Sequence, residues 1–207
     1  MAQVFPTKAN LMATQKSLDL AKLGYELMDR KRNILVREMM QLADEAKEVE
    51  SRIGEAYAEA YSYLRLANIT LGVCGNYARA VPVETGLTLD YKSVMGVELP
   101  MLSLEDAAPS PYYGFHNTNS YLDEAYIRFN EVKALTVRLA EVQTSVFRLA
   151  DAVKKTQKRA NALHNIMIPQ FTATVKFITE ALDEKEREDF TRLKVVKSQK
   201  EKQEQEQ

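Results

Sequence analysis

The sequence predicts an all-α protein: a long antiparallel two-helix left-handed coiled coil, with a short β-hairpin and irregular insert between the two arms. Three observations predict it. The 207 residues include only seven glycines and six prolines, so little interrupts a helix. Four of the prolines and three of the glycines fall between Arg79 and Asn117. On both sides of that stretch, apolar residues recur with the spacing of a heptad.

The first arm, 1–78, keeps this spacing from Leu11 to Thr70. Taking steps of three and four residues alternately, fifteen of eighteen positions are apolar or aromatic. A pattern held over about eight heptads predicts a coiled coil, and a period of about 3.5 residues predicts a left-handed supercoil.

The insert, 79–117, combines turn residues with two segments of strand character. Residues 86–91 alternate apolar and polar side chains, and 93–99 form a second such run before Pro100, so a small hairpin is expected. Residues 107–115 are rich in Pro, Tyr and Gly and are expected to be irregular. Several side chains in 117–120 could cap the next helix.

The second arm, 118–196, repeats the heptad pattern from Ala125 to Met167, with eleven of thirteen positions apolar. The pattern then slips by four residues to Phe171 and continues to Leu182. Pro169 lies in the slip and removes a helical hydrogen bond, so a helix kink is expected near Ile166. The remaining segment, 197–207, is almost wholly Lys, Glu and Gln and is predicted to be a flexible charged tail.

Each apolar stripe needs a partner, and two stripes of similar length most simply bury each other. Placing the turn at the middle of the insert gives the pairing rule that partner numbers sum to roughly 196. The first arm would be on the order of 95 Å long, with both chain termini at the end opposite the insert.

Charge and composition exclude several classes of function. A formal net charge of −1 does not favour nucleic acid as a partner. No apolar run approaches the roughly 18 residues of a membrane-spanning helix, and the N-terminus does not resemble a signal peptide. The single cysteine, Cys74, cannot form an internal disulfide, which fits a reducing compartment.

Residues that carry chemistry are scarce. The sequence lacks phosphate-binding loops, dinucleotide fingerprints and zinc-protease motifs, so no cofactor is expected. The pairing rule places His116 and His164 far apart, and both are interpreted as solvated side chains rather than metal ligands. Cys74 is interpreted as a small buried residue rather than a reactive thiol. For Tyr57 and Tyr61, which flank the apolar stripe, a core role and a contact with a partner protein both remain open.

Several segments carry a family resemblance. The run TQKRANAL at 156–163, Ile168 and Pro169, the run TVKFI at 174–178 and the charged block 182–194 resemble the C-terminal signature of the D subunit family of V-type and archaeal A-type rotary ATPases. Residues 6–11, 27–32 and 94–100 resemble other parts of that family. His164 and Ala160 depart from its usual pattern.

The resemblance implies a non-catalytic central rotor shaft. Its two-terminus tip would enter a hexamer of A and B subunits, and its other end would join the F subunit and a funnel-shaped subunit on the membrane rotor ring. It would transmit torque between ATP hydrolysis or synthesis and ion translocation, as part of a peripheral complex on the cytoplasmic face. It would neither bind nucleic acid nor insert into the membrane.

Two sets of contact residues follow from this implied role. Charged residues near the two-terminus tip are expected to contact the hexamer: Lys8, Lys16, Arg187, Arg192, Lys194 and Lys197. Aromatic and aliphatic residues nearer the insert are expected to contact the F subunit: Tyr57, Tyr61, Leu64, Tyr126, Phe129 and Val132.

Two other classes remain open from the sequence. A prefoldin-like coiled-coil chaperone would expose apolar residues at its tip, whereas this tip is expected to be charged and to lack large apolar patches. A coiled-coil tether on membranes would need a basic stripe along one face, whereas basic residues here alternate with acidic ones.

Overall fold

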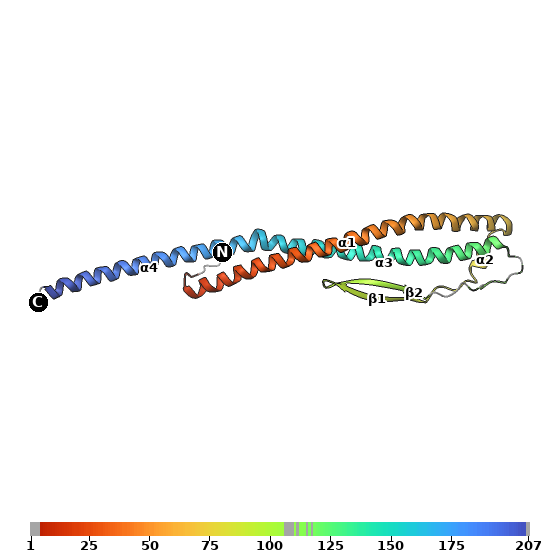
Figure 1. Ribbon diagram of the computed structural model, residues 1–207. Helices are drawn as coiled ribbons and strands as arrows, with labels where there is room; N and C mark the ends of the chain where they lie inside the picture. Colours follow the sequence, from red (N-terminus) through yellow and green to blue (C-terminus); the bar gives the residue numbers. More distant parts are fainter. Residues whose placement is uncertain (1–4, 106–109, 111, 115, 117, 206–207) are drawn as a thin grey trace. The chain divides into compact units, whose positions relative to one another are not determined.

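The computed structural model describes residues 5–105, 110, 112–114, 116 and 118–205, and it divides into two compact units. One unit comprises Met1–Arg32 and Lys155–Gln207, and the other comprises Asn33–Lys154. The long helices are α1 (Lys8–Leu71), α3 (Ser120–Ala162) and α4 (Ile168–Gln205), which are separated by short elements (Figure 1). These are α2 (Gly75–Ala78), the strands β1 (Leu87–Val94) and β2 (Val97–Leu104), and the π-helical segment η1 (Leu163–Met167).

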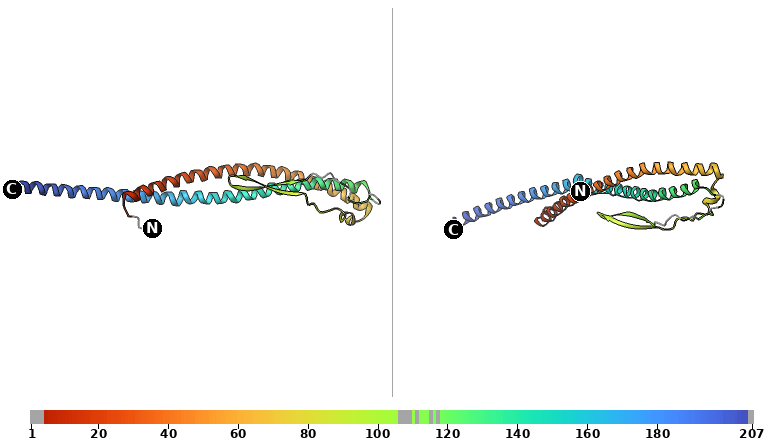
Figure 2. Two further views of the ribbon diagram at one scale, coloured as in Figure 1. Left: turned by 90° about the horizontal axis from the view of Figure 1, so that it is seen from below. Right: turned by 45° about the vertical axis from the view of Figure 1, so that its right-hand side comes forward.

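Within unit 33–154, the second part of α1 and the first part of α3 run side by side in opposite directions (Figures 1 and 2). This arrangement confirms the predicted fold class of helical arms with a small β-hairpin between them. The turn is fixed at both helix ends. Gly72, with φ of 79°, ends α1, and the Asn119 side chain accepts the Leu122 N–H (3.1 Å) and caps α3.

Burial follows the predicted apolar stripe closely. All the buried residues of α1 occupy predicted heptad positions: Leu18, Ala21, Leu35, Val49, Ile53, Ala60 and Ala67. The same holds for most buried residues of α3 and α4: Ala125, Val132, Val142, Leu149, Thr156, Ala160 and Ile178. Leu122 and Ser145 are buried next to the stripe, where a first-turn residue and a small side chain fill remaining space.

The predicted pairing rule holds to within three residues for Lys8 with Glu186 and for Tyr57 with Thr136, and it deviates further elsewhere. In unit 33–154, Glu45 pairs with Arg138 rather than with Asp151. In the other unit, the Arg32 guanidinium donates to Gln157 Oε1 (2.8 Å) rather than meeting His164. Partners lie closer to the insert than expected because the helix caps, not the middle of the insert, determine where the chain turns.

The β-hairpin turns at Met95 and Gly96, not before Ser93 as the predicted strand boundaries imply. Both turn residues have positive φ, 51° and 76°, as a two-residue type I′ turn requires. The two strands pair antiparallel over their whole length, from Leu87 with Leu104 to Val94 with Val97. The sequence-based prediction placed these turn residues inside the second strand.

The hairpin packs onto the helices, which the sequence did not predict. Leu99 of β2 is buried with Leu35 of α1 and Leu149 of α3, and Val94 and Val97 pack around them. Polar contacts with α3 support this core. Arg148 donates to the Glu98 carbonyl (2.9 Å) and lies over the Tyr91 ring at 5.6 Å from its centroid, and the Leu102 N–H donates to Glu141 Oε2 (3.3 Å).

In the unit that contains α4, the slip in the apolar pattern coincides with η1. A π-helix takes about five residues per hydrogen-bonded turn, and the Ile168 N–H bonds to the Leu163 carbonyl in that way. The inner stripe therefore steps from Leu163 to Ile168, and Met167, predicted to lie on it, is 38% exposed. Pro169 is the second residue of α4, one residue after Ile168. That it bends the helix near Ile166 stays a prediction.

The helix α4 continues to Gln205 and so includes most of the predicted tail 197–207. Parts of the predicted irregular stretch, including 106–109, 111, 115 and 117, lie outside the described residues. Among the residues that the structure describes, no helix has both the length and the apolar composition needed to cross a bilayer.

Candidate functional site

An aromatic cluster, formed by Tyr57, Tyr61 and Phe129, lies where α1 and α3 face each other in unit 33–154. The Tyr57 and Tyr61 rings stack at 6.0 Å, and the Phe129 ring meets Tyr61 edge-on at 5.3 Å. These geometries are those that aromatic pairs prefer. Tyr61 nevertheless remains 57% exposed, so the cluster presents a pre-organised aromatic surface to solvent.

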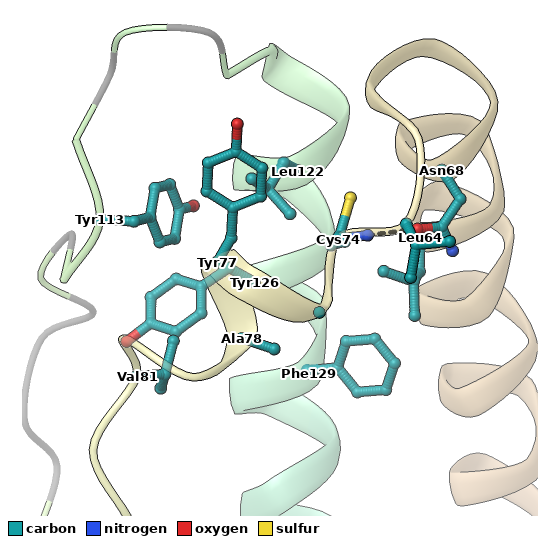
Figure 3. Close-up of a pocket in the computed structure, with 13 residues that line it drawn as sticks. Leu64, Asn68, Cys74, Tyr77, Ala78, Val81, Tyr113, Leu122, Tyr126 and Phe129 are labelled. Carbon is teal, nitrogen blue, oxygen red and sulfur yellow. Dashed lines mark hydrogen bonds between the residues drawn. The ribbon is translucent and has the colours of Figure 1, made fainter.

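A cavity of about 480 Å³ lies beside this cluster and is shown in Figure 3. Its walls come from the end of α1, from α2, from the first turns of α3 and from Tyr113 of the insert. The lining is predominantly apolar: Leu64, Asn68, Val73, Cys74, Gly75, Tyr77, Ala78, Val81, Tyr113, Leu122, Ala125, Tyr126 and Phe129.

Local hydrogen bonds explain how the insert closes this cavity. The Cys74 N–H donates to the Asn68 side chain (3.1 Å), which directs the chain into α2 after α1 has ended. The Tyr113 hydroxyl donates to Asp123 Oδ1 (2.8 Å). Burial, and then the hydrogen bond to the Asp123 carboxylate, raise the pKa of Tyr113 well above its ordinary value, so this donor stays protonated.

Cys74 is 6% exposed and packs with Ala67 and Leu122, as expected for a small buried side chain. The His164 ring lies against Tyr25 with ring centroids 5.0 Å apart and planes tilted by 40°, while His116 is exposed. In the described part of the chain, no group of His, Cys, Asp or Glu side chains could hold a metal ion.

A charged network borders the aromatic cluster. Arg128 of α3 reaches Glu59 of α1 (3.4 Å) and also contacts Glu124 (3.2 Å) and Glu131 (3.3 Å) on its own helix. The Glu59 charge contributes most to raising the pKa of Arg128. Arg128 occupies a predicted stripe position, and it ties the two helices together at the rim of the stripe rather than inside it.

The structure brings together five of the six residues predicted to contact the F subunit. Leu64, Tyr126 and Phe129 line the cavity, and Phe129 connects it to Tyr61 and Tyr57. Val132 differs, because it is 2% exposed and packs between the helices. It can support this surface but cannot be part of its outer face.

The residues predicted to contact a hexamer lie in the other unit. Lys8 pairs with Glu186 (2.9 Å), Arg187 with Glu184 (3.9 Å) and Arg192 with Glu188 (3.6 Å), all between well-exposed side chains. Lys16, Lys194 and Lys197 are exposed as well. Such pairs are individually weak and leave the cations able to exchange partners.

Exposed apolar side chains occur at this end, where the sequence led us to expect no large apolar patch. Phe190 is 72% exposed and Leu193 is 69% exposed, and Val195 and Val196 are about half exposed. The spacing of Phe190 and Leu193, three residues apart on a helix, is the signal that could have found them. The sequence alone predicts a charged segment here, because Lys, Arg, Glu and Asp surround these two apolar residues.

The fold and these surfaces define a class: an all-α protein of long helical arms with a small β-hairpin between them. Its aromatic cluster and the charged side chains of α4 lie on exposed surfaces and do not form an enclosed site. Comparison with known proteins gives the family within this class. The family model for the D subunit of ATP synthase matches residues 10–198, and the chain belongs to this family.

Full-length relatives agree. The chain is 40% identical over 196 residues to the D subunit of a V-type ATP synthase from Thermotoga neapolitana, covering 94% of this chain and 97% of the relative. It is 35% identical over 201 residues to the D subunit of an A-type ATP synthase from Thermococcus sibiricus, covering 95% and 94%. It is also 35% identical over 201 residues to the corresponding A-type D subunit of Methanopyrus kandleri, covering 95% and 87%.

Proposed function

We propose that the chain is the central rotor shaft of a V-type or A-type ATPase and transmits torque between an A/B hexamer and a membrane rotor ring. Family membership over residues 10–198 is the observation that carries this proposal. The buried stripe residues of α1 within each of the two units support it physically, since helices packed through such a stripe resist bending and twisting.

In this role the chain is not catalytic and needs no cofactor. The A and B subunits hydrolyse or synthesise ATP, and the shaft joins their hexamer to a funnel-shaped subunit on the rotor ring. The chain then belongs to a peripheral complex at the cytoplasmic face, with no nucleic acid as partner and no direct insertion into the membrane.

The hexamer contact is proposed on the part of the chain with exposed cations: Lys8, Lys16, Arg187, Arg192, Lys194 and Lys197. Exposed ion pairs typically contribute about 0–1 kcal/mol each, which suits a shaft that must exchange contacts while it turns. Phe190 and Leu193 add apolar surface on the same stretch of α4.

The contact with the F subunit is proposed on the aromatic cluster. Tyr61 and Phe129 pack edge-on, so much of their conformational entropy is already lost before a partner binds. Leu64 and Tyr126 extend the surface into the cavity, and Tyr57 continues it along α1. Truncating a central aromatic residue of such an interface costs roughly 1–3 kcal/mol of binding free energy.

A pair of double variants tests both proposed surfaces. Tyr61→Ala with Phe129→Ala should weaken binding of the F subunit, measured by titration of the two purified proteins. Arg187→Ala with Arg192→Ala should leave the F subunit bound and lower hexamer affinity or ATP-driven rotation. Release of the F subunit by the arginine changes alone would show that the two surfaces are assigned the wrong way round.

Purification from the native cell tests the shaft proposal as a whole. Co-purification with the nucleotide-binding A and B subunits is expected. Recovery with unfolded client proteins would instead indicate a prefoldin-like chaperone, and recovery with lipid would indicate a tether.

A further inference from the structure

The two edges of the β-hairpin differ in how they are covered. Because Val94 and Val97 close the two-residue turn as a hydrogen-bonded pair, alternate residues of β2 direct their backbone groups away from β1. These residues are Glu98, Pro100, Leu102 and Leu104. α3 binds two of their outward groups: Arg148 donates to the Glu98 carbonyl and Glu141 accepts from the Leu102 N–H. Pro100 has no N–H and is buried.

The outer edge of β1 has no such cover. By the same register, Leu87, Leu89, Tyr91 and Ser93 direct their N–H and C=O groups outward, and the residues that the structure describes place no hydrogen-bond partner on them. The seven residues from Leu87 to Ser93 are all exposed. An exposed strand edge of this length is a template for pairing with another strand.

We propose that β1 pairs antiparallel with β1 of a second copy of this chain, which joins two hairpins into a four-stranded sheet. The outward backbone groups allow pairings in which both partners have odd residue numbers. Centring the twofold axis on Tyr91 places Asp90 opposite Lys92 of the second copy, and Lys92 opposite Asp90 of the second copy. Two ion pairs then form at close, non-hydrogen-bonded positions, where opposite charges stabilise a sheet.

Charge also excludes the neighbouring registers. A shift of the axis to Asp90 places two carboxylates directly opposite each other, and a shift to Lys92 does the same with two ammonium groups. Like charges at such positions destabilise pairing. Of these three registers, only the one centred on Tyr91 is self-complementary, as a twofold interface requires.

The helices that the structure describes do not pair with the outer edge of β1. α3 binds outward backbone groups of β2, and Val94, Val97 and Leu99 pack against the helices near the turn, so the outward backbone groups of β1 stay available to a second copy. The four-stranded sheet should also be more stable than a two-stranded hairpin, which is marginally stable by itself. The interface is short, so the dimer should form reversibly with concentration.

This inference goes beyond the proposed function, because a shaft occupies one central position and the paired state concerns the free chain. Pairing through β1 therefore competes with any partner that covers the hairpin in an assembly. Monomeric behaviour of the free chain would leave the shaft proposal intact, and failure to bind a hexamer would leave the dimer intact.

Sedimentation equilibrium of the purified full chain over a wide concentration range tests the pairing. The wild type should show a reversible monomer–dimer equilibrium. Asp90→Lys should raise the dissociation constant roughly tenfold, because two attractive contacts become repulsive. The exchange of both charges, Asp90→Lys with Lys92→Asp, should restore dimerisation. Asp189→Lys on α4, which has the same change of net charge, should have no effect.

A backbone change tests the edge itself. Leu89→Pro removes one outward N–H but none that β2 uses, just as Pro100 is tolerated in β2. Circular dichroism should therefore be unchanged while dimerisation is lost. A chain that is monomeric at every concentration, or a dimer that neither Asp90→Lys nor Leu89→Pro weakens, overturns the proposal.

Discussion

The centre of unit 33–154 and the last part of α4 use similar apolar side chains in opposite ways. In the first region, α1, α3 and β2 enclose Leu35, Leu99 and Leu149, of which Leu35 and Leu149 are 0% exposed. In the second region, a single helix leaves Phe190 and Leu193 about 70% exposed. Side chains in the first region stabilise the chain itself, whereas those in the second have their apolar surface available for a partner.

This difference follows from the number of segments that meet. A helix pair buries only the inner stripe of each helix, as at Ile178 of α4, which is 0% exposed, and a third segment extends burial beyond that stripe. The hairpin supplies that third segment around Leu149. The final turns of α4 lie beyond the ion pair between Lys8 of α1 and Glu186, and in the described part of the chain no second segment buries Phe190 or Leu193.

The comparison predicts its largest effect at Leu149. Leu149→Ala should lower the free energy of unfolding by about 2–5 kcal/mol, because it leaves a cavity among three segments that cannot collapse independently. Urea denaturation followed by circular dichroism measures this loss. Leu193→Ala is the matched control on α4, and its effect should stay within about 0.5 kcal/mol. Equal losses for the two variants would remove the distinction between the regions.

The sequence predicted the part of this comparison that depends on local periodicity. The positions of Leu35 and Leu149 follow from the heptad spacing, because a helix repeats its faces at a fixed interval. The packing of Leu99 against them could not be predicted, because it joins residues far apart in the chain and no short-range pattern encodes it. The sequence also could not predict which residues of α1 and α3 lie opposite each other. That pairing depends on where the two helices end, at Gly72 and Asn119.

The surfaces were predictable to different degrees. Tyr57 and Tyr61 could be found from the sequence because they flank a regular stripe. The cavity beside them depends on Tyr113, which reaches Asp123 from an irregular segment, so periodicity gave no sign of it. Val132 was predicted to contact the F subunit because it is apolar. It occupies a position of the apolar stripe, however, and is buried between the helices.

A second prediction concerns Pro169, near the start of α4, the helix whose last turns expose Phe190 and Leu193. Pro169→Ala restores a backbone donor next to η1 and should raise the free energy of unfolding by about 1–2 kcal/mol, since an interior proline removes a hydrogen bond and crowds the preceding turn. Thermal unfolding of the full chain measures the change. In an assembled ATPase, a stiffer arm should also slow rotation. Unchanged stability and rotation would show that the proline does not matter for either.

A third, smaller effect is expected where the hairpin meets α3. Arg148→Ala removes the hydrogen bond to the Glu98 carbonyl and the contact with the Tyr91 ring, and should cost about 1 kcal/mol. Hydrogen exchange of β2 amides should become faster, while amides in the middle of α4 should be unaffected. Arg148→Lys keeps the charge but loses the planar donor geometry, so it should restore only part of the protection.

The smallest effect is expected at Tyr113, on the wall of the cavity. Tyr113→Phe removes the hydrogen bond to Asp123 and should lower the free energy of unfolding by about 0.5–1 kcal/mol. The local opening can be followed through the reaction of the buried Cys74 thiol with a chromogenic disulfide, which should become faster. Tyr112→Phe, at a neighbouring exposed tyrosine, is the matched control and should leave that rate unchanged.

The pH dependence gives this last prediction a second readout. The folded state raises the pKa of Tyr113 above its unfolded value of about 10, so the unfolded chain loses this proton first as pH rises. The contribution of Tyr113 is therefore complete below about pH 10 and decreases as pH rises towards the folded pKa. Tyr113→Phe has no phenolic proton and should lack this part of the alkaline loss of stability. Identical alkaline profiles for wild type and variant would show that the hydroxyl is neither buried nor held by Asp123 in solution.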